Sequence, residues 1–270
     1  METRRIEHHM SPSELATFDD AAGKSVPAVE LHGVSKSYVR GSTSTRVVHD
    51  VSLTVKRGEC IFLLGPSGSG KTTLLSIIGC VLAADFGSVR ILGRSISDVA
   101  PDAAAQLRRR HIGFVFQRFH LIRGLTACEN VAVPLTLSQW RPADATQRAV
   151  ELLSRVGMSK HTNAQPQHLS VGQCQRVAFA RALACNPDLI LADEPTASPD
   201  AKTGHQALEL LRDLTVAAGK TVIIVTHDPR ILKFADRILH MENGTLEERT
   251  PSDDAMTDIM SIRDSLVVAH

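Results

Sequence analysis

Residues 60–73, CIFLLGPSGSGKTT, join an apolar run to a glycine-rich stretch. Cys60–Leu64 is a continuous apolar run typical of a buried strand, and Gly65 and Pro66 end it. Residues 65–72 then match the pattern G-x-x-x-x-G-K-[ST] in full. We therefore expect a buried strand, a glycine-rich loop and a helix that begins near Gly70.

This loop is a candidate phosphate site. Glycines allow backbone N–H groups to turn inward around phosphate groups, and the helix N-terminus adds partial positive charge. Lys71 can reach the β- and γ-phosphates of a nucleotide, and the Thr72 hydroxyl can bind Mg²⁺. The residues predicted to contact the nucleotide here are Gly65, Pro66, Ser67, Gly68, Ser69, Gly70, Lys71, Thr72 and Thr73.

A second apolar strand ends in two acidic residues. The run LILADE, residues 189–194, places Asp193 and Glu194 at a strand's C-terminal end, where parallel sheets bind their ligands. Asp193 is predicted to hold Mg²⁺ and Glu194 to act as the general base for an attacking water.

The rest of the chain alternates strand and helix patterns. Strands are predicted at 29–31, 47–55, 111–116, 189–192 and 221–226, and helices at 103–110, around 149–156 and at 201–218. Asn243-Gly244 is a hairpin-turn signal between two apolar runs. Such alternation favours a parallel sheet flanked by helices, and hence an α/β fold. Residues 1–27 read as a poorly ordered leader, and residues 249–270 as a tail without an assigned role.

Composition excludes several classes of protein. Thirty basic and twenty-nine acidic residues give a net charge of +1, so no overall field favours nucleic acid. The five cysteines include no C-x-x-C pair and are expected to be reduced thiols, with no zinc site. Apolar runs are far shorter than the roughly 20 residues of a membrane span, and the acidic N-terminus is unlike a signal peptide.

The order of the motifs resembles the ATP-binding cassette family. After the phosphate loop come Gln117, Leu169-Ser170-Val171-Gly172-Gln173, Asp193-Glu194 and His227. The resemblance covers residues 28–248, which it implies form an ATPase domain. It implies an α/β P-loop NTPase core with a mixed or parallel sheet, an N-terminal antiparallel β region, and an inserted α-helical subdomain at about 96–180.

The resemblance also assigns roles to single residues. Tyr38 resembles the aromatic residue that stacks on adenine, although it could equally be a partly buried strand residue. Gln117 resembles the glutamine that touches Mg²⁺ or the lytic water, and His227 the histidine that contacts the γ-phosphate and steadies Glu194. The implied catalytic residues are Glu194, His227 and Gln117, and the implied metal ligands are Thr72, Gln117 and Asp193.

In this family two copies dimerise head to tail around ATP. The resemblance implies that each ATP lies between one copy's phosphate loop and Ser170, Gly172 and Gln173 of the other copy. Asp200 resembles an aspartate that crosses this interface, and Pro199 replaces the family's usual leucine, which we expect to stiffen the loop. ATP binding would close the dimer and hydrolysis would reopen it.

A transport ATPase is the main functional expectation. With no span of its own, the chain would need a separate membrane permease subunit and would sit at the cytoplasmic face of the inner or cell membrane. We expect docking within residues 117–137, where Phe119, Leu121, Ile122 and Leu125 are apolar; packing inside the subdomain is the alternative.

The sequences of two segments indicate a subclass of the family. IGFVFQRFHLIRGLTACENVAVPL (112–135) and ADEPTASPD (192–200) look most like the ATPases of lipoprotein-release and macrolide-efflux systems, which implies export or extraction of a lipophilic substrate or lipoprotein. A methionine-type importer and a cell-division-type ATPase remain alternatives. So does a nucleotide-gated clamp with little hydrolysis, although Glu194, Gln117 and His227 together argue against it.

Val171 stands where the family usually has glycine. The run Ser170 to Gln173 fits an S-x-x-Q capping box, with Ser170 as N-cap and Val171 at the first helical position. Valine tolerates the ordinary helical angles of that position at a cost of some tenths of a kcal/mol. We therefore expect Val171 to be a mild change that leaves Ser170 and Gly172 in place.

Overall fold

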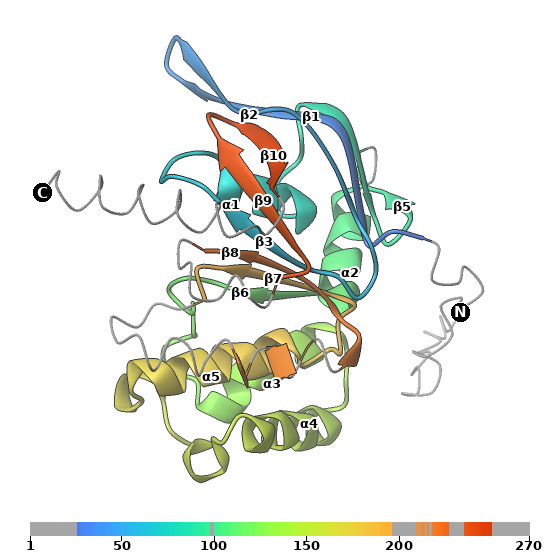
Figure 1. Cartoon of the computed structure of the whole chain (residues 1–270). Helices are drawn as coiled ribbons and strands as arrows, with labels where there is room; N and C mark the ends of the chain where they lie inside the picture. The colour runs from blue at the N-terminus through green and yellow to red at the C-terminus, as the bar shows by residue number, and fades with distance from the viewer. Residues whose placement is uncertain are drawn as a thin grey trace, which may run out of the picture.

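The computed structural model describes residues 26–97, 100–195, 209–210, 212–213, 215, 218–226 and 235–249. Two sheets organise this part of the chain (Figure 1). The first is antiparallel, in the order β2-β1-β4-β5. It contains β1 (Val29–Arg40), β2 (Thr43–Val55), β4 (Phe86–Ile91) and β5 (Arg94–Ser95).

The second sheet has the order β10-β9-β3-β8-β7-β6. It contains β3 (Cys60–Leu64), β6 (Ile112–Val115), β7 (Leu189–Asp193), β8 (Thr221–Val225), β9 (Arg237–Glu242) and β10 (Thr245–Arg249). All neighbours are parallel except the hairpin of β9 and β10. Its turn residues Asn243 and Gly244 both have positive φ, as the predicted hairpin turn requires.

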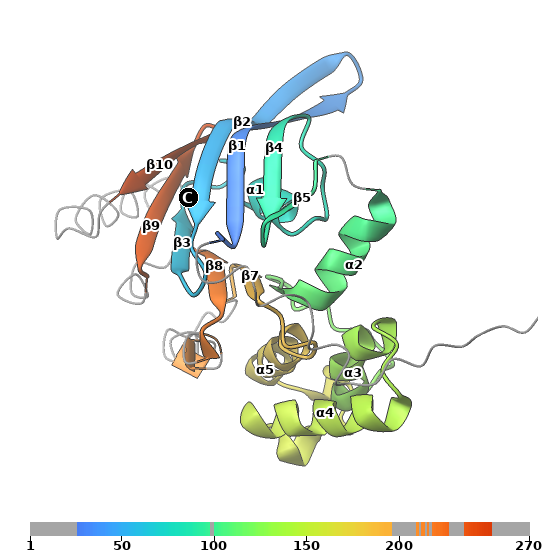
Figure 2. The same ribbon diagram turned by 90° about the vertical axis from the view of Figure 1, so that its right-hand side faces the viewer.

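Five α-helices lie wholly within these ranges. They are α1 (Lys71–Ile78), α2 (Pro101–His111), α3 (Ala127–Leu137), α4 (Pro142–Arg155) and α5 (Val171–Ala182). Two short 3-10 turns, Ser159–His161 and Pro166–His168, precede α5. Helices α3, α4 and α5 gather on one side of the second sheet, while α1 and the antiparallel sheet lie on its other side (Figures 1 and 2).

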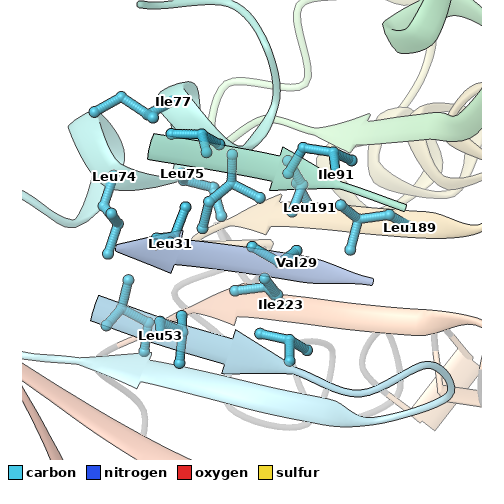
Figure 3. Packing of buried hydrophobic residues seen from close by; sticks show 14 of the residues in the cluster. Val29, Leu31, Leu53, Leu74, Leu75, Ile77, Ile91, Leu189, Leu191 and Ile223 are labelled. Carbon is cyan, nitrogen blue, oxygen red and sulfur yellow. The ribbon is translucent and has the colours of Figure 1, made fainter. Parts of the chain in front are cut away.

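The second sheet separates two hydrophobic cores. On β3, Ile61 and Leu63 face the core shared with α1 and the antiparallel sheet, whereas Phe62 and Leu64 face the core under α3, α4 and α5. The first of these cores is drawn in Figure 3. Strands β3 and β8 are buried along their whole length, as expected for strands covered on both faces.

The predicted α/β class, the mixed sheet with flanking helices and the antiparallel N-terminal region are confirmed. Strands β4 and β5 are not among the predicted elements, because their residues show no clear alternation. The helix predicted at 201–218, the leader and the tail lie largely or wholly outside the described residues. Among the described residues, no helix has the length and apolar character needed to span a bilayer.

Candidate active site

The glycine-rich loop joins β3 to α1. Gly70 is the N-cap of α1 and has a φ of +103°, in the left-handed region that favours glycine. A Cβ at this position would also lie 2.5 Å from the carbonyl oxygen of Val47. The first turn of α1 contains Lys71, Thr72 and Thr73 and no acidic residue. No carboxylate of this turn therefore neutralises the partial positive charge of the helix N-terminus. The loop therefore suits an anion such as phosphate.

A cleft of about 370 Å³ opens over this loop. The residues that line it are Val47, Ser67, Gly68, Gly70, Lys71, Thr72, Thr73, Gln117, Asp193, Glu194 and Val225. The structure thus brings most of the predicted loop residues together with the predicted glutamine and both carboxylates. Val47 and Val225 were not expected there, since nothing in their local pattern distinguishes them from other strand residues.

Lys71 is buried and folds back over the loop. Its Nζ donates to the carbonyl oxygens of Gly65 at 2.9 Å and Pro66 at 2.7 Å, and to the Ser69 hydroxyl at 3.4 Å. Burial lowers the pKa of the Lys71 ammonium, while the nearby carboxylate of Glu194 acts in the opposite direction. The ammonium therefore lies at the loop, within the lining of the cleft.

Thr72 and Asp193 form the first polar pair across the cleft. The Thr72 hydroxyl on α1 donates to Oδ2 of Asp193, at the end of β7, at 2.9 Å. Burial raises the pKa of the Asp193 carboxyl, and the hydrogen bond from Thr72 partly offsets this. The pair places a hydroxyl and a carboxylate, two hard oxygen donors, side by side.

Gln117 and Glu194 form the second pair. Gln117 follows β6, Glu194 follows β7, and Nε2 of Gln117 donates to Oε2 of Glu194 at 2.7 Å. The backbone of Glu194 has a φ of +44° and its N–H donates to the Val225 carbonyl at 2.9 Å. A left-handed non-glycine residue at a site like this indicates a constrained position for the Glu194 side chain.

Tyr38 lies on the same side of the molecule as the loop. The residue is 46% exposed, and its hydroxyl is 3.5 Å from the Thr73 hydroxyl on α1. The exposed ring next to the loop is compatible with stacking on a base.

Ser170, Gly172 and Gln173 lie at the start of α5. The predicted capping box is present: the Gln173 N–H donates to Ser170 Oγ at 3.3 Å, and the Ser170 N–H donates to Gln173 Oε1 at 2.9 Å. Val171 occupies the first helical position and is 53% exposed. Among the described residues that line the cleft, none belongs to α5. Within one chain, this helix start is therefore separate from the cleft.

Two predicted site residues, Asp200 and His227, lie outside the described residues, as does Pro199. Two further residues, Gln175 and Arg181 of α5, contact the segments that follow Glu194 and Gln117. Gln175 donates to the Pro195 carbonyl, directly after Glu194, and Arg181 donates to carbonyls shortly after Gln117. No motif signals these contacts, because each joins segments at least 20 residues apart.

Comparison with known proteins agrees with this geometry. Residues 48–197 match the family described as ABC transporter. The chain is 41% identical over 218 residues to the macrolide export ATP-binding/permease protein MacB of Psychrobacter cryohalolentis, covering 81% of this chain and 33% of that protein. It is 44% identical over 224 residues to MacB of Salmonella choleraesuis, covering 83% and 34%. The chain thus spans about a third of the length of these curated relatives.

A solved structure is also similar. The dimeric post-hydrolysis state of the ATP-binding cassette MJ0796 bound to ADP and Pi shares 42% identity and superposes with a TM-score of 0.77. The match covers 83% of this chain and 99% of that one. The membership expected from the order of the sequence motifs is confirmed, and the chain belongs to the ATP-binding cassette (ABC) transporter family.

Proposed function

We propose that this cassette binds and hydrolyses ATP, with Mg²⁺, to drive export through a membrane permease. The observation that supports this most directly is the pair of contacts across one cleft, Thr72 with Asp193 and Gln117 with Glu194, beside the Lys71 ammonium. These residue types are the ones that phosphoryl transfer to water requires: a cation for the phosphates, oxygen ligands for a metal, and a base. The proposed extent of the cassette is 28–248.

The nucleotide would lie along the glycine-rich loop. In the proposal its adenine stacks on Tyr38, and its phosphate oxygens accept hydrogen bonds from backbone N–H groups of the loop and of the first turn of α1. The Lys71 ammonium, whose partners are carbonyls of the loop itself, would turn to the β- and γ-phosphates. Each of these contacts uses a group already beside the cleft.

The residues present fit a magnesium ion. Thr72, Gln117 and Asp193 would hold it, and when bound it neutralises charge on the phosphates. Glu194 would accept the proton of the attacking water while Gln117, 2.7 Å away, orients its carboxylate. His227 is proposed to steady Glu194 and the γ-phosphate.

The complete site is proposed to need two copies of the chain. Ser170, Gly172 and Gln173 lie away from the cleft of their own chain, at a helix N-terminus that suits phosphate. A head-to-tail dimer would bring them, together with Asp200, to the nucleotide of the other copy. The similar MJ0796 cassette was solved as a dimer bound to ADP and Pi, which supports this arrangement.

The partner is proposed to be a membrane permease, with the cassette at the cytoplasmic face of the membrane. The curated relatives are named ATP-binding/permease proteins for macrolide export, which supports export over import. Within residues 117–137, Ile122 and Leu137 are 45% and 58% exposed, whereas Leu121 packs against the core under α3, α4 and α5. The exposed members are the better candidates for docking.

Replacing Glu194 with Gln tests the proposal. With ATP and Mg²⁺, we expect Glu194→Gln to elute as a dimer on sizing chromatography and to release phosphate at least about 100-fold more slowly than wild type, because a general base contributes at least that much. Glu151→Gln, which removes an exposed carboxylate of α4, is the control and should behave as wild type. A Glu194→Gln chain that stays monomeric, or a wild type no faster than it, would contradict hydrolysis between two copies.

A further inference from the structure

The turn that follows Gln117 has an unfavourable backbone conformation. Phe119 and His120 are consecutive non-glycine residues with φ of +58° and +45°. Left-handed angles bring the Cβ of an L-residue close to its own carbonyl oxygen, so they are unfavourable outside glycine. The Phe119 N–H donates to the Phe116 carbonyl at 2.9 Å, and the His120 N–H to the Arg118 carbonyl at 2.6 Å. Both hydrogen bonds join residues within the turn, so they do not attach the turn to the rest of the protein.

Asn130 of α3 holds the N–H and the carbonyl of Ile122, just after the turn, whereas Arg181 holds the two left-handed residues themselves. Its guanidinium reaches from the last turn of α5 and donates through Nη1 to the His120 carbonyl at 2.6 Å and through Nη2 to the Phe119 carbonyl. The two bonds join segments 61 and 62 residues apart, and both end on the left-handed residues. A planar guanidinium presents two N–H groups in a fixed fork, which a lysine ammonium cannot reproduce.

The placement of Arg181 follows from close packing between α5 and β6. Gly113 of β6 lies directly against the end of α5, because a Cβ there would be 2.3 Å from the Ala182 carbonyl oxygen. Burial lowers the pKa of the Arg181 guanidinium. Among the described residues, no carboxylate forms an ion pair with Arg181, so its hydrogen bonds go to the two carbonyls of the turn.

The same helix contacts the loop after Glu194. Gln175, which is 1% exposed, donates through Nε2 to the Pro195 carbonyl. Gln175 and Arg181 are six positions apart, or about 9 Å along the helix axis. Helix α5 therefore touches the segments behind both members of the Gln117–Glu194 pair, and its first residues carry the Ser170 capping box.

We propose that Arg181 is a positioning residue for hydrolysis, which fixes the Phe119–His120 turn and so holds Gln117 at Glu194. Through this contact, a shift of α5 when Ser170 engages the other copy's nucleotide would be passed to Gln117. The inference rests on the proposed function, because it takes the roles of Gln117 and Glu194 from it. A purely structural Arg181 would contribute to stability without acting on the rate of the chemical step.

The first test compares Arg181→Lys and Arg181→Met with Arg176→Met. Arg176 is a matched control, since it lies on the same helix and donates to a single backbone carbonyl, that of Val156, at 3.1 Å. We expect both Arg181 variants to lower kcat by about tenfold to a hundredfold, the range for a misplaced catalytic group. Their KM and their affinity for a fluorescent ATP analogue should stay within about twofold of wild type, because α1 and the phosphate loop are untouched. Arg176→Met should keep the wild-type kcat.

The second test asks whether the turn is what Arg181 supports. Adding His120→Gly to Arg181→Met removes the side chain that disfavours the left-handed angle, so glycine should restore the turn and recover kcat severalfold. His120→Gly alone also removes the ring that stacks on Phe116, but it should change kcat little, because Arg181 still holds the carbonyls of the turn. Thermal unfolding transitions should first show that both proteins are folded. A double variant whose kcat does not recover would then overturn the proposal. Equal kcat values for Arg181→Met and Arg176→Met would also overturn it.

Hydrogen exchange separates this inference from the proposed function. In the isolated wild-type chain, amides of residues 117–121 should exchange more slowly than in Arg181→Lys, and Arg176→Met should match wild type. A wild type that releases no phosphate would defeat the proposed function, while the exchange comparison would still decide the role of Arg181. Unchanged exchange in Arg181→Lys would overturn the inference even if the wild type hydrolyses ATP.

Discussion

Ser170 has two separable roles, one as a helix cap and one as a proposed ligand of the other copy's nucleotide. The chain offers a matched pair of capping boxes for telling them apart. In α5, the Gln173 N–H donates to Ser170 Oγ at 3.3 Å; in α3, the Glu129 N–H donates to Thr126 Oγ1 at 3.2 Å. In both, the third residue reaches back to the cap's own N–H. The two boxes are thus nearly equivalent as structure, but only Ser170 is proposed to meet a phosphate.

Alanine at either cap should therefore cost similar stability. Loss of a serine or threonine N-cap costs about 1 kcal/mol, which corresponds to a fall in Tm of roughly 2–4 °C for a domain of this size. The two substitutions should differ in their effect on ATPase activity. Removing a hydrogen bond to a charged group costs about 1.5–3 kcal/mol, so Ser170→Ala should lower kcat/KM for ATP by about tenfold to a hundredfold. Thr126→Ala should leave it within about twofold of wild type.

Phosphate release measured over a range of ATP concentrations gives kcat/KM. Thermal unfolding of the same preparations gives Tm. Ser170→Gly adds a third point, because glycine keeps most of the capping stability but lacks the hydroxyl. It should unfold close to wild type and be as inactive as Ser170→Ala. If Ser170→Ala and Thr126→Ala lose equal activity, or if Ser170→Gly is fully active, then the Ser170 hydroxyl is a cap and not a nucleotide ligand.

Three further outcomes are expected. Val171→Gly should keep ATPase activity within about threefold and lower the free energy of unfolding by a few tenths of a kcal/mol; activation by orders of magnitude would show that the exposed valine obstructs the nucleotide. Cys60, whose pKa burial raises to about 12, should react with iodoacetamide at pH 8 far more slowly in the folded chain than in urea, by peptide mass mapping. Ile122→Ser with Leu137→Ser should reduce binding to permease-containing membranes while ATP binding is retained, whereas the equally exposed Val150→Ser on α4 should not.

Local motifs were enough to predict the parts of the site that short stretches of chain build. The loop at 65–72 and the capping box at Ser170 each depend on residues close together in the chain, so residue type and spacing specify them. The hairpin at Asn243 is predictable for the same reason. By contrast, the strand order that places β6 beside β7 and β8 between β7 and β3 depends on how distant strands pack, and alternation of strand and helix does not determine it.

The contact between Gln117 and Glu194 illustrates that limit. Val115 of β6 is in register with Ala192 of β7, so Gln117 and Glu194 each lie two positions beyond this pair and meet at 2.7 Å. Because successive side chains of a strand point to opposite faces, a shift of one residue would set Gln117 opposite Asp193 or Pro195 instead. Neither the sequence around Gln117 nor the sequence around Glu194 specifies that register. Strand β6 also packs closely against the end of α5 at Gly113, next to the residue Arg181 that reaches the turn after Gln117. The geometry of the polar pair and the support of the loop that supplies its glutamine thus both rest on contacts between segments distant in the chain, which no local motif specifies.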